Sequence, residues 1–258
     1  MRVGLIGLGA IGGGLLRYLR SEDGFDLVGA LVRDPHKPRP AASGLPLVTT
    51  VEDLLARRPE VVVEMGGHAA LACHGPAVLR AGVDLLIVSV GALAEPAVET
   101  AILDAARAGT SQARIASGAI GALDAIAAAA VGGLERVTHT TRKPARTLLT
   151  PEEARQLDGP REIFRGSARQ GALLFPESVN VAAAVSLAGL GLDRTEVCVI
   201  ADPSVQRNQH EVVAEGTFGR LRFEIQNIPT DENPRTGRLV AMSLAHALRA
   251  RRAALSVG

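Results

Sequence analysis

His210 is the residue whose type and position most suggest chemistry. It lies in the stretch DPSVQRNQHEVVAEG, residues 202–216, after a hydrophobic run and before an alternating one, so we expect it in a polar loop between two strands. An imidazole with an ordinary pKa of about 6.5 can accept and release a proton near neutral pH. Loops held by a rigid sheet often carry site residues, but a histidine in such a loop is also a common surface residue. The pattern alone therefore makes His210 a candidate acid or base and nothing more.

A second chemical motif, GLGAIG, lies near the N-terminus between an expected strand and an expected helix. Gly7 permits a tight turn, Gly9 lets the backbone approach a pyrophosphate, and Gly12 lets the helix pack closely on the strand. With Ala10 and Ile11, the start of the helix supplies N–H groups and a favourable dipole for phosphate. A close strand-to-helix turn without a ligand would need similar glycines, but the position of the motif favours a dinucleotide site.

The segment about 20 residues beyond the glycines leaves the choice between NAD and NADP open. An acidic residue usually binds the ribose of NAD there, whereas Val32 occupies that position in this chain. Arg33 is a candidate to stack on adenine and bind a 2′-phosphate, while Asp34 remains a candidate for the ribose. A solvated charge pair is the alternative interpretation of these two residues.

Composition favours a globular protein that binds small molecules. The chain has 258 residues, of which 47% are apolar and 21% charged, and its net charge is +1 without basic or acidic blocks. This length suffices for one large domain or two small ones. The charge gives no electrostatic reason to expect nucleic acid or an anionic membrane as a partner. An aromatic content of 2% argues against stacking platforms for bases or sugars.

Several sequence features point to the cytoplasm and away from a metal site. Cys73 and Cys198 are far apart and form no CxxC pair, so we expect reduced thiols within the core. We find no signal-peptide pattern and no uncharged apolar stretch of 18 residues. His68 and His74 are six residues apart, which does not align two ligands on one face of a helix, and we expect no metal.

The first part of the chain alternates short apolar runs with helical patterns, which is typical of parallel strands joined by helices. The expected strands are RVGLIG, DLVGALV, VVVEM, DLLIVSV and ARIAS, and the expected helices are IGGGLLRYLR, residues 69–80 and residues 96–108. This series predicts a doubly wound sheet.

The second part of the chain predicts a different sheet. SGAIG opens an Ala-rich helix, and longer strands follow in ERVTHTTRKP and EVCVIA. EVVAEGTF and LRFEIQNI predict a hairpin with its turn at Gly219 and Arg220. Leu221, Phe223 and Ile225 alternate with polar residues, which indicates an antiparallel sheet covered on one face.

The motifs GLIGLGAIG, VSVGALAE, SGAIGALDAI, RKPA, FPESVNVAA, GLDRTEVCVIADP, NQHEV and NPRTG, in this order over nearly the whole chain, resemble the L-aspartate dehydrogenase family. The resemblance implies oxidation of L-aspartate to iminoaspartate or oxaloacetate plus ammonia, or the reverse reductive amination, with NAD or NADP. The imine formed in this way can feed NAD biosynthesis.

The resemblance also implies an architecture, that of a split Rossmann dinucleotide-binding domain around a central α+β domain. The Rossmann domain would comprise residues 1–117 and 232–258, and the catalytic and dimerisation domain residues 118–231, with a largely antiparallel sheet. Asn233 and Pro234 would start a final helix that runs to about Arg252 and closes the first domain. A homodimer is implied.

For individual residues, the resemblance implies that Ala119 and Asn180 contact the nicotinamide cofactor and that His210 is the active-site residue. Val32 departs from relatives that carry Asp at this position, so a strict preference for NAD is not implied.

L-Aspartate carries two carboxylates, whose charge the site must offset with cations or N–H donors. The first candidates for this role are Lys143, Asn208 and Ser89, and the second are Arg142 and Thr236. Each of these side chains has a solvated or structural alternative.

Two other functions remain open at this point. A related two-domain reductase of homoserine dehydrogenase or dihydrodipicolinate reductase type would show the same glycine turn and sheet pattern. A nicotinamide-nucleotide sensor would bind the cofactor without catalysis. NQHEV and SVNVA favour the dehydrogenase over the first alternative, and the presence of His210 argues against the second.

Overall fold

The computed structural model describes residues 1–19, 24–42, 44–175, 179–233 and 236–256. The chain divides into two compact units. One comprises Met1–Gly118 with Thr230–Gly258, and the other comprises Ala119–Pro229. No helix among the described residues is long and apolar enough to cross a membrane.

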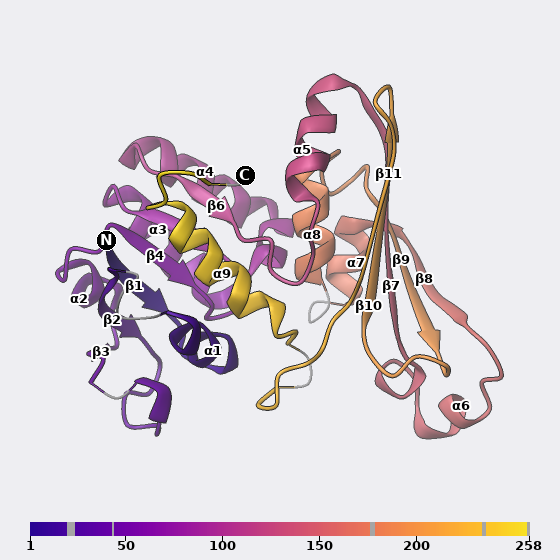
Figure 1. Ribbon diagram of the computed structural model, residues 1–258, viewed down its shortest axis with the longest axis horizontal. Helices are drawn as coiled ribbons and strands as arrows, with labels where there is room; N and C mark the ends of the chain where they lie inside the picture. The colour runs from indigo at the N-terminus through magenta and orange to yellow at the C-terminus, as the bar shows by residue number, and fades with distance from the viewer. Residues whose placement is uncertain (20–23, 43, 176–178, 234–235, 257–258) are drawn as a thin grey trace. The chain divides into compact units, whose positions relative to one another are not determined.

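The first unit contains a parallel sheet of six strands in the order β3-β2-β1-β4-β5-β6 (Figure 1). The strands are β1 (Arg2–Ile6), β2 (Asp26–Leu31), β3 (Leu47–Val48), β4 (Val61–Glu64), β5 (Asp84–Ile87) and β6 (Ala113–Ile115). The central strands are mainly buried aliphatic residues, because helices cover both faces of the sheet. The predicted doubly wound sheet is confirmed, and its strand order reverses beside β1, where ligands of such sheets bind.

Five helices of the described segments accompany this sheet: α1 (Ala10–Tyr18), α2 (Val51–Leu55), α3 (His68–Arg80), α4 (Pro96–Gly109) and α9 (Leu239–Ala250). Short 3-10 turns lie at Pro40–Ala42 and Val90–Ala94. In Figure 1, α9 lies beside α1, although these helices are far apart in sequence. The sequence patterns missed β3 and α2, which are too short to show a period.

The second unit contains a five-stranded sheet in the order β11-β10-β7-β9-β8. The strands are β7 (Leu134–Pro144), β8 (Arg161–Ser167), β9 (Glu196–Asp202), β10 (Gln209–Gly216) and β11 (Gly219–Gln226). The β7–β9 pair is parallel and the other three pairs are antiparallel, so the prediction of a largely antiparallel sheet is confirmed. The sequence patterns missed β8.

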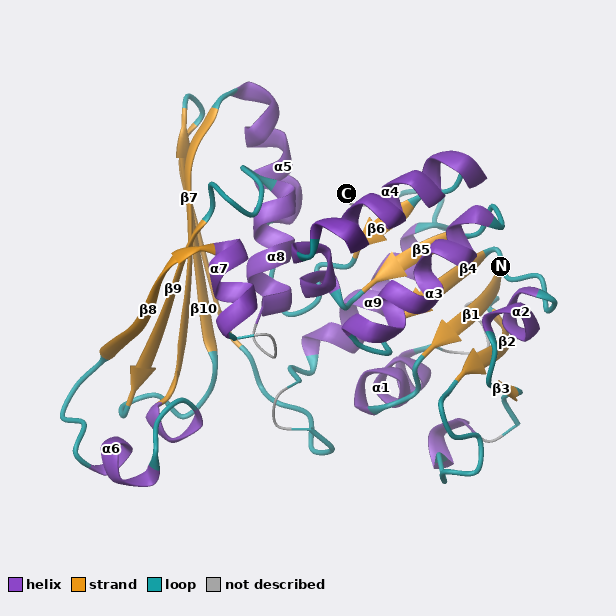
Figure 2. Ribbon diagram, turned by 180° about the vertical axis from the view of Figure 1, so that it is seen from behind, coloured by secondary structure: helices purple, strands orange, loops and turns teal. Residues whose placement is uncertain are grey.

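Three helices cover one face of this sheet, α5 (Leu123–Gly132), α7 (Ala168–Leu174) and α8 (Val179–Ala188) (Figure 2). No described helix covers the opposite face. We call the two faces the helix-covered face and the open face.

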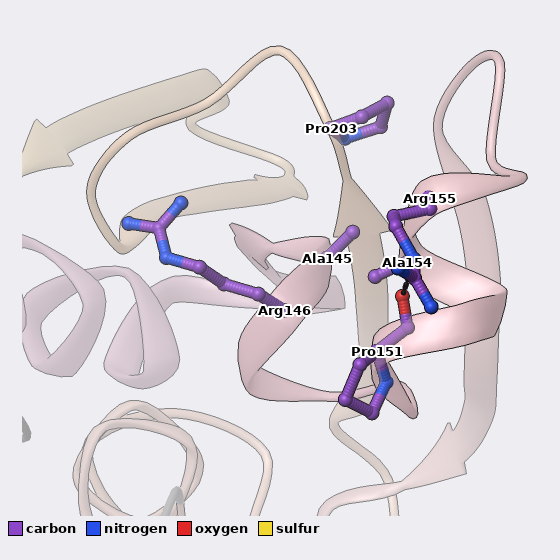
Figure 3. Close-up of a pocket in the computed structure, with 6 residues that line it drawn as sticks. All are labelled: Ala145, Arg146, Pro151, Ala154, Arg155 and Pro203. Atoms are coloured by element: carbon purple, nitrogen blue, oxygen red, sulfur yellow. Dashed lines mark hydrogen bonds between the residues drawn. The ribbon is translucent and has the colours of Figure 1, made fainter.

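The connection from β7 to β8 contains a 3-10 turn (Ala145–Thr147) and α6 (Pro151–Arg155). Thr150 and Glu153 begin α6 with reciprocal side-chain to backbone hydrogen bonds, a capping box. This connection, with Pro203, lines a cavity of about 360 Å³ (Figure 3). Figure 3 shows the side chain of Arg146 extending away from α6, and none of the predicted site residues lines this cavity.

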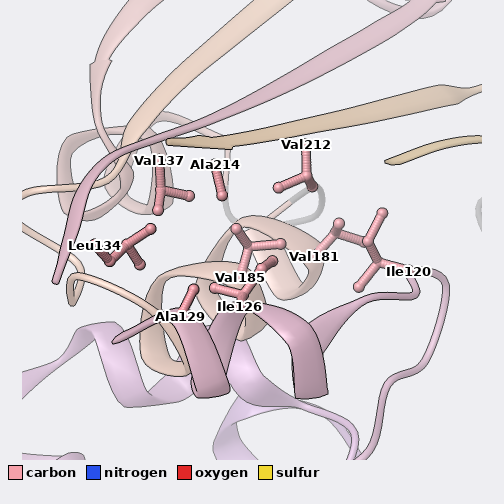
Figure 4. Close-up of a cluster of buried hydrophobic side chains, with 9 residues drawn as sticks. All are labelled: Ile120, Ile126, Ala129, Leu134, Val137, Val181, Val185, Val212 and Ala214. Carbon is pink, nitrogen blue, oxygen red and sulfur yellow. The ribbon is translucent and has the colours of Figure 1, made fainter. Parts of the chain in front are cut away.

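The core of the second unit lies between the helix-covered face and its helices. Figure 4 shows nine buried side chains that meet there: Ile120, Ile126, Ala129, Leu134, Val137, Val181, Val185, Val212 and Ala214. Leu221, Phe223 and Ile225 of β11 pack against this cluster, as their alternation predicted. Their polar neighbours are exposed.

Three local predictions are wrong. His210 is not in a loop but is the second residue of β10, where it pairs with Thr141 and Ile225. The polar residues around it face the open side of the sheet, so the strand resembles a loop in sequence. The hairpin turn lies at Thr217 and Phe218, because Gly219 already pairs with Gly216. Cys73 is exposed on α3, whereas Cys198 is buried as expected.

The last helix also starts later than predicted. Pro234 lies outside the described residues, and Thr236 precedes the helix, which begins at Leu239. Asn233 donates its backbone N–H to the Thr230 hydroxyl at 3.1 Å and thus belongs to a turn before the helix.

Candidate active site

The glycine turn joins β1 to α1 with the geometry that its sequence predicted. Gly7 has φ +85°, and a Cβ there would lie 2.6 Å from the Cα of Gly66, so a side chain is excluded both by conformation and by space. A Cβ on Gly12 would lie 3.2 Å from the carbonyl oxygen of Gly7. Gly9 faces open space, since a Cβ at this position would meet no atom within 4 Å. The backbone at Gly9 is therefore open to close approach by a ligand.

The residues fit a dinucleotide at this turn. Gly9 is the N-cap of α1 and no side chain caps the helix, so the first N–H groups, which include those of Ala10 and Ile11, remain for an anion. A cavity of about 830 Å³ adjoins the turn and reaches the end of β2. It is lined by Ile6, Gly7, Leu8, Gly9, Leu31, Val32, Arg33, Asp34, Lys37, Pro38, Arg39, Thr49, Met65, Gly66, Ala69, Ala70 and His74.

Three cationic side chains line this cavity near the end of β2. Val32 is buried, so the position usually held by an acid is part of the core. Arg33 is exposed and lines the cavity, together with Lys37 and Arg39, which the sequence patterns did not single out. The carboxylate of Asp34 accepts the backbone N–H of His36 at 2.9 Å and thereby shapes the turn.

Glu64, at the carboxyl end of β4, is a fully buried acid that the sequence analysis missed. Its carboxylate accepts the backbone N–H groups of Gly66 (2.8 Å) and Ser89 (3.1 Å) and the Ser89 hydroxyl (2.8 Å). Burial raises the pKa of Glu64, and these hydrogen bonds oppose that rise. Gly66 lies close to Gly7, since a Cβ on Gly7 would be 2.6 Å from the Cα of Gly66. The network therefore fixes a segment that packs against the glycine turn.

His210 belongs to a buried polar cluster on the helix-covered face of the second unit. Its Nδ1 lies 3.3 Å from Nε2 of His139 and 3.2 Å from Oγ1 of Thr141, and the two imidazole rings stack with their centroids 5.4 Å apart. His139 is fully buried and His210 is 7% exposed. Strand alternation places His139, Thr141 and Lys143 in one row on β7, beside His210 on β10.

Burial keeps both imidazoles neutral. Desolvation is the larger cause and the nearby ammonium of Lys143 the smaller, and together they lower the pKa of His210 from 6.5 to about 4. The same causes, with His210 itself, lower the pKa of His139 well below its usual value. Neutral His210 beside a cation can hold or move a proton near an anionic substrate.

Comparison with known proteins identifies the family of this chain. Residues 124–251 match the family model described as aspartate dehydrogenase, C-terminal, and residues 7–116 match homoserine dehydrogenase, NAD binding domain. L-Aspartate dehydrogenase of Ruegeria pomeroyi is 45% identical, covering 99% of this chain and 94% of its own. This chain belongs to the L-aspartate dehydrogenase family.

Another member of the family, from Cupriavidus taiwanensis, is 43% identical over the full length of both chains. The crystal structure of aspartate dehydrogenase from Thermotoga maritima matches with a TM-score of 0.82 and 24% identity, covering 100% of this chain and 99% of its own. This structural likeness supports the family fold. The match to the homoserine dehydrogenase NAD-binding model shows why the first part of the chain alone did not separate the two families.

In this member of the family, Asn227 connects two predicted site residues. Its side-chain amide donates to the carbonyl of Ala119 at 2.9 Å, and its backbone N–H donates to the carbonyl of Asn208 at 3.1 Å. Asn227 is buried at the end of β11, and the sequence analysis did not find it. A lone polar residue after a strand carries no distinctive signal, but here it ties the Ala119 turn to the segment before His210.

The other predicted residues of this family member lie in different surroundings. Asn180 is exposed in the first turn of α8, and Ser89 uses its hydroxyl in the Glu64 network. Arg142 lies on the open face and pairs with Asp202 at 2.7 Å, so it projects away from the row of Lys143. Thr236 belongs to the turn before α9.

Proposed function

We propose that this chain is an NAD(P)-dependent L-aspartate dehydrogenase, which oxidises L-aspartate to iminoaspartate, hydrolysed to oxaloacetate and ammonia, or runs the reverse reductive amination. We assign nucleotide binding to the first unit and catalysis to the second. The observation that carries the proposal is the buried neutral imidazole of His210 beside the ammonium of Lys143, in a chain matched along its length by L-aspartate dehydrogenases.

The chemistry divides between the nucleotide and the residues of this chain. When bound, the nicotinamide accepts the hydrogen of the substrate Cα with its electron pair. The glycine turn with Ala10 and Ile11 holds the pyrophosphate, and Ala119 and Asn180 orient the nicotinamide end. The substrate nitrogen loses a proton as the C=N bond forms. Water then adds to the imine, and departure of ammonia leaves the ketone.

His210 serves the proton transfers, and nearby groups offset the charge of the substrate. The imidazole exchanges a proton with the oxygen that adds to, or leaves from, the imine carbon. Lys143, with the Asn208 amide as a further donor, offsets the two carboxylates. Ser89 does not serve this role, because its hydroxyl and its backbone N–H both donate to Glu64.

An assay with purified protein tests the activity. L-Aspartate with NAD or NADP, and oxaloacetate plus ammonia with NADH or NADPH, are each followed by absorbance of the reduced nicotinamide. We expect turnover with L-aspartate, and His210→Ala should lower it by about 10² to 10⁴-fold while nucleotide binding persists. No turnover with either nucleotide at neutral and alkaline pH would overturn the activity, and near-normal turnover of His210→Ala would overturn the role of His210 alone.

We also propose that the protein uses NADP, with Arg33 as the residue that binds the 2′-phosphate. Arg33, Lys37 and Arg39 line the cavity and supply cations for a phosphate. The side chain of Val32, at the position usually held by an acid, is buried and apolar and cannot bind a ribose hydroxyl. Arg33→Ala should weaken NADPH binding and leave NADH binding nearly unchanged. Equal weakening of both nucleotides, measured by calorimetric titration, would contradict this role.

We propose that two copies pair through the open face of the second unit. Val213 lies between Thr138 and Arg222 in one row across the sheet, flanked by the Arg136–Glu215 and Arg222–Glu211 ion pairs. A two-fold related copy can meet these alternating charges with opposite ones. Val213→Arg should give a monomer in sedimentation, whereas Val131→Arg, on the exposed surface of α5, should not change the mass. A monomeric parent protein would refute the dimer.

We place the enzyme in the cytoplasm. Both cysteines are free thiols, and Cys73 is exposed, which suits a reducing compartment. Fractionation of cells followed by immunodetection tests this location.

A further inference from the structure

His139 has a buried ring nitrogen that the proposed mechanism does not use. Its Nε2 lies 3.3 Å from Nδ1 of His210 and 3.4 Å from Oγ1 of Thr141. Its Nδ1 has no hydrogen-bond partner among the described residues, although the ring is fully buried. The three side chains lie side by side on β7 and β10, because Thr141 pairs with His210 in register and His139 is two residues before Thr141.

The unpartnered nitrogen indicates where the hydrogen of His139 lies. A neutral imidazole has one N–H donor and one lone-pair acceptor. A donor buried without a partner is rarer in proteins than an incompletely used acceptor, because the lost hydrogen bond to water is not replaced. The arrangement with the lower free energy therefore leaves the lone pair on Nδ1 and places the hydrogen on Nε2, which faces Thr141 and His210.

This hydrogen determines the direction of the bonds that follow. The Nε2–H of His139 donates to the hydroxyl of Thr141, which donates in turn to Nδ1 of His210 at 3.2 Å, or it donates to that Nδ1 directly. Nδ1 of His210 is the acceptor in both arrangements. The hydrogen of neutral His210 then resides on Nε2.

We propose that His139 and Thr141 are positioning residues that hold His210 in the tautomer with Nε2–H. The inference rests on the proposed function of His210 and deepens it, because this tautomer presents a donor to the substrate. In the reductive direction Nε2–H donates a hydrogen bond to the leaving oxygen of the hydroxyl-bearing intermediate. The nitrogen lone pair of that intermediate forms the C=N bond as the C–O bond breaks, and a proton from solvent completes the departing water.

The opposite tautomer is disfavoured by the same geometry. For Nε2 of His210 to accept a proton while the ring is neutral, its hydrogen must move to Nδ1 and donate to Thr141. The Thr141 hydroxyl then donates to Nε2 of His139, which places a buried N–H on Nδ1 of His139 without a partner. Proton acceptance at Nε2 of neutral His210 thus carries the cost of this rearrangement, whereas hydrogen-bond donation from Nε2–H does not.

Nitrogen-15 NMR of the histidine-labelled full-length protein, without substrate and near pH 7.5, tests the tautomer directly. Resonances are assigned by comparison with His210→Gln and His139→Gln. We expect the N–H type of shift for Nε2 of both residues and the lone-pair type for both Nδ1 atoms. An N–H on Nδ1 of His210 in the parent protein would overturn the proposal.

Matched variants of Thr141 test the consequence. Thr141→Val removes the hydroxyl and should mix the two tautomers of His210. It should lower kcat for reductive amination, but by less than the ~10²-fold that loss of an acid catalyst costs at minimum. Thr141→Ser keeps the hydroxyl and should restore both the shifts and kcat, with KM for the reduced nucleotide unchanged in both variants. A Thr141→Val protein with parental shifts and kcat would refute the role of Thr141 and assign the tautomer to the direct His139–His210 hydrogen bond alone. The NMR result stands apart from the activity, so an inactive parent protein with the expected shifts would refute only the proposed function.

Discussion

At the scale of single residues, the environment of His210 decides its chemistry more than its residue type does. An exposed imidazole would titrate near neutral pH, whereas burial and the Lys143 ammonium hold the pKa of His210 at about 4. The group is therefore neutral over the whole range in which the assay is run. Its one N–H can donate a hydrogen bond to an anionic substrate.

Replacing Lys143 tests the electrostatic part of this description. Lys143→Met removes the cation but retains an unbranched apolar side chain, so the pKa of His210 should rise from about 4. It should stay below 6.5, because desolvation is the larger cause of the shift. The measurement is an NMR pH titration of the His210 ring, with Lys37→Met in the other unit as the control. A pKa that does not move would show that the Lys143 charge does not reach His210.

At the scale of elements, the turn between β1 and α1 combines a structural glycine with a functional one. Gly7 is required by its positive φ and by the closeness of Gly66, whereas Gly9 has an ordinary conformation and faces open space. The two glycines thus serve different purposes, although the motif presents them as equivalent.

Three alanine substitutions separate these roles. Gly9→Ala should leave the melting temperature almost unchanged but weaken nucleotide binding, because its methyl group occupies the space needed for the pyrophosphate. Gly7→Ala should destabilise the fold itself. Gly13→Ala is the control, since its methyl group would meet only Ala41 at 3.9 Å, and alanine in this helix should stabilise by about 0.5–1 kcal/mol. Full nucleotide affinity in Gly9→Ala would contradict the proposed contact.

At the scale of the whole molecule, the buried histidines make the stability depend on pH. His210 has a folded pKa of about 4 and an ordinary pKa of 6.5, so the unfolded chain binds the additional proton. Its contribution is fully present above pH 6.5 and is lost as the pH falls through 4. The loss amounts to about 3 kcal/mol, because one pKa unit corresponds to about 1.4 kcal/mol.

Urea unfolding followed by circular dichroism between pH 7.5 and 4 measures this loss. The free energy of unfolding of the parent protein should fall more steeply over this range than that of His210→Gln, which has no imidazole at this position. His36→Gln, at an exposed loop, should behave like the parent protein. Parallel curves for the parent protein and His210→Gln would refute the buried neutral state.

Much of the architecture follows from local sequence. The glycine turn, the parallel strands and the alternation of β11 were predictable because each depends on residues close together in the chain, whose spacing repeats the period of a strand or helix. Recognition of the family came from motifs spread along the chain, and the comparisons agree with it. Short elements such as β3 and α2 have too few residues to show a period.

The tertiary structure alone decided the surroundings of His210 and Glu64. The register of β10 against β7 brings His210 into contact with His139 and Thr141, which precede it by 71 and 69 positions. No spacing within the sequence encodes such a pairing. The same holds for Glu64, whose partner Ser89 lies just beyond the next strand, and for Asn227, whose partner Ala119 is 108 residues away. The sequence by itself determined which groups are available for chemistry, whereas strand pairing and burial decided which of them meet and in which protonation state.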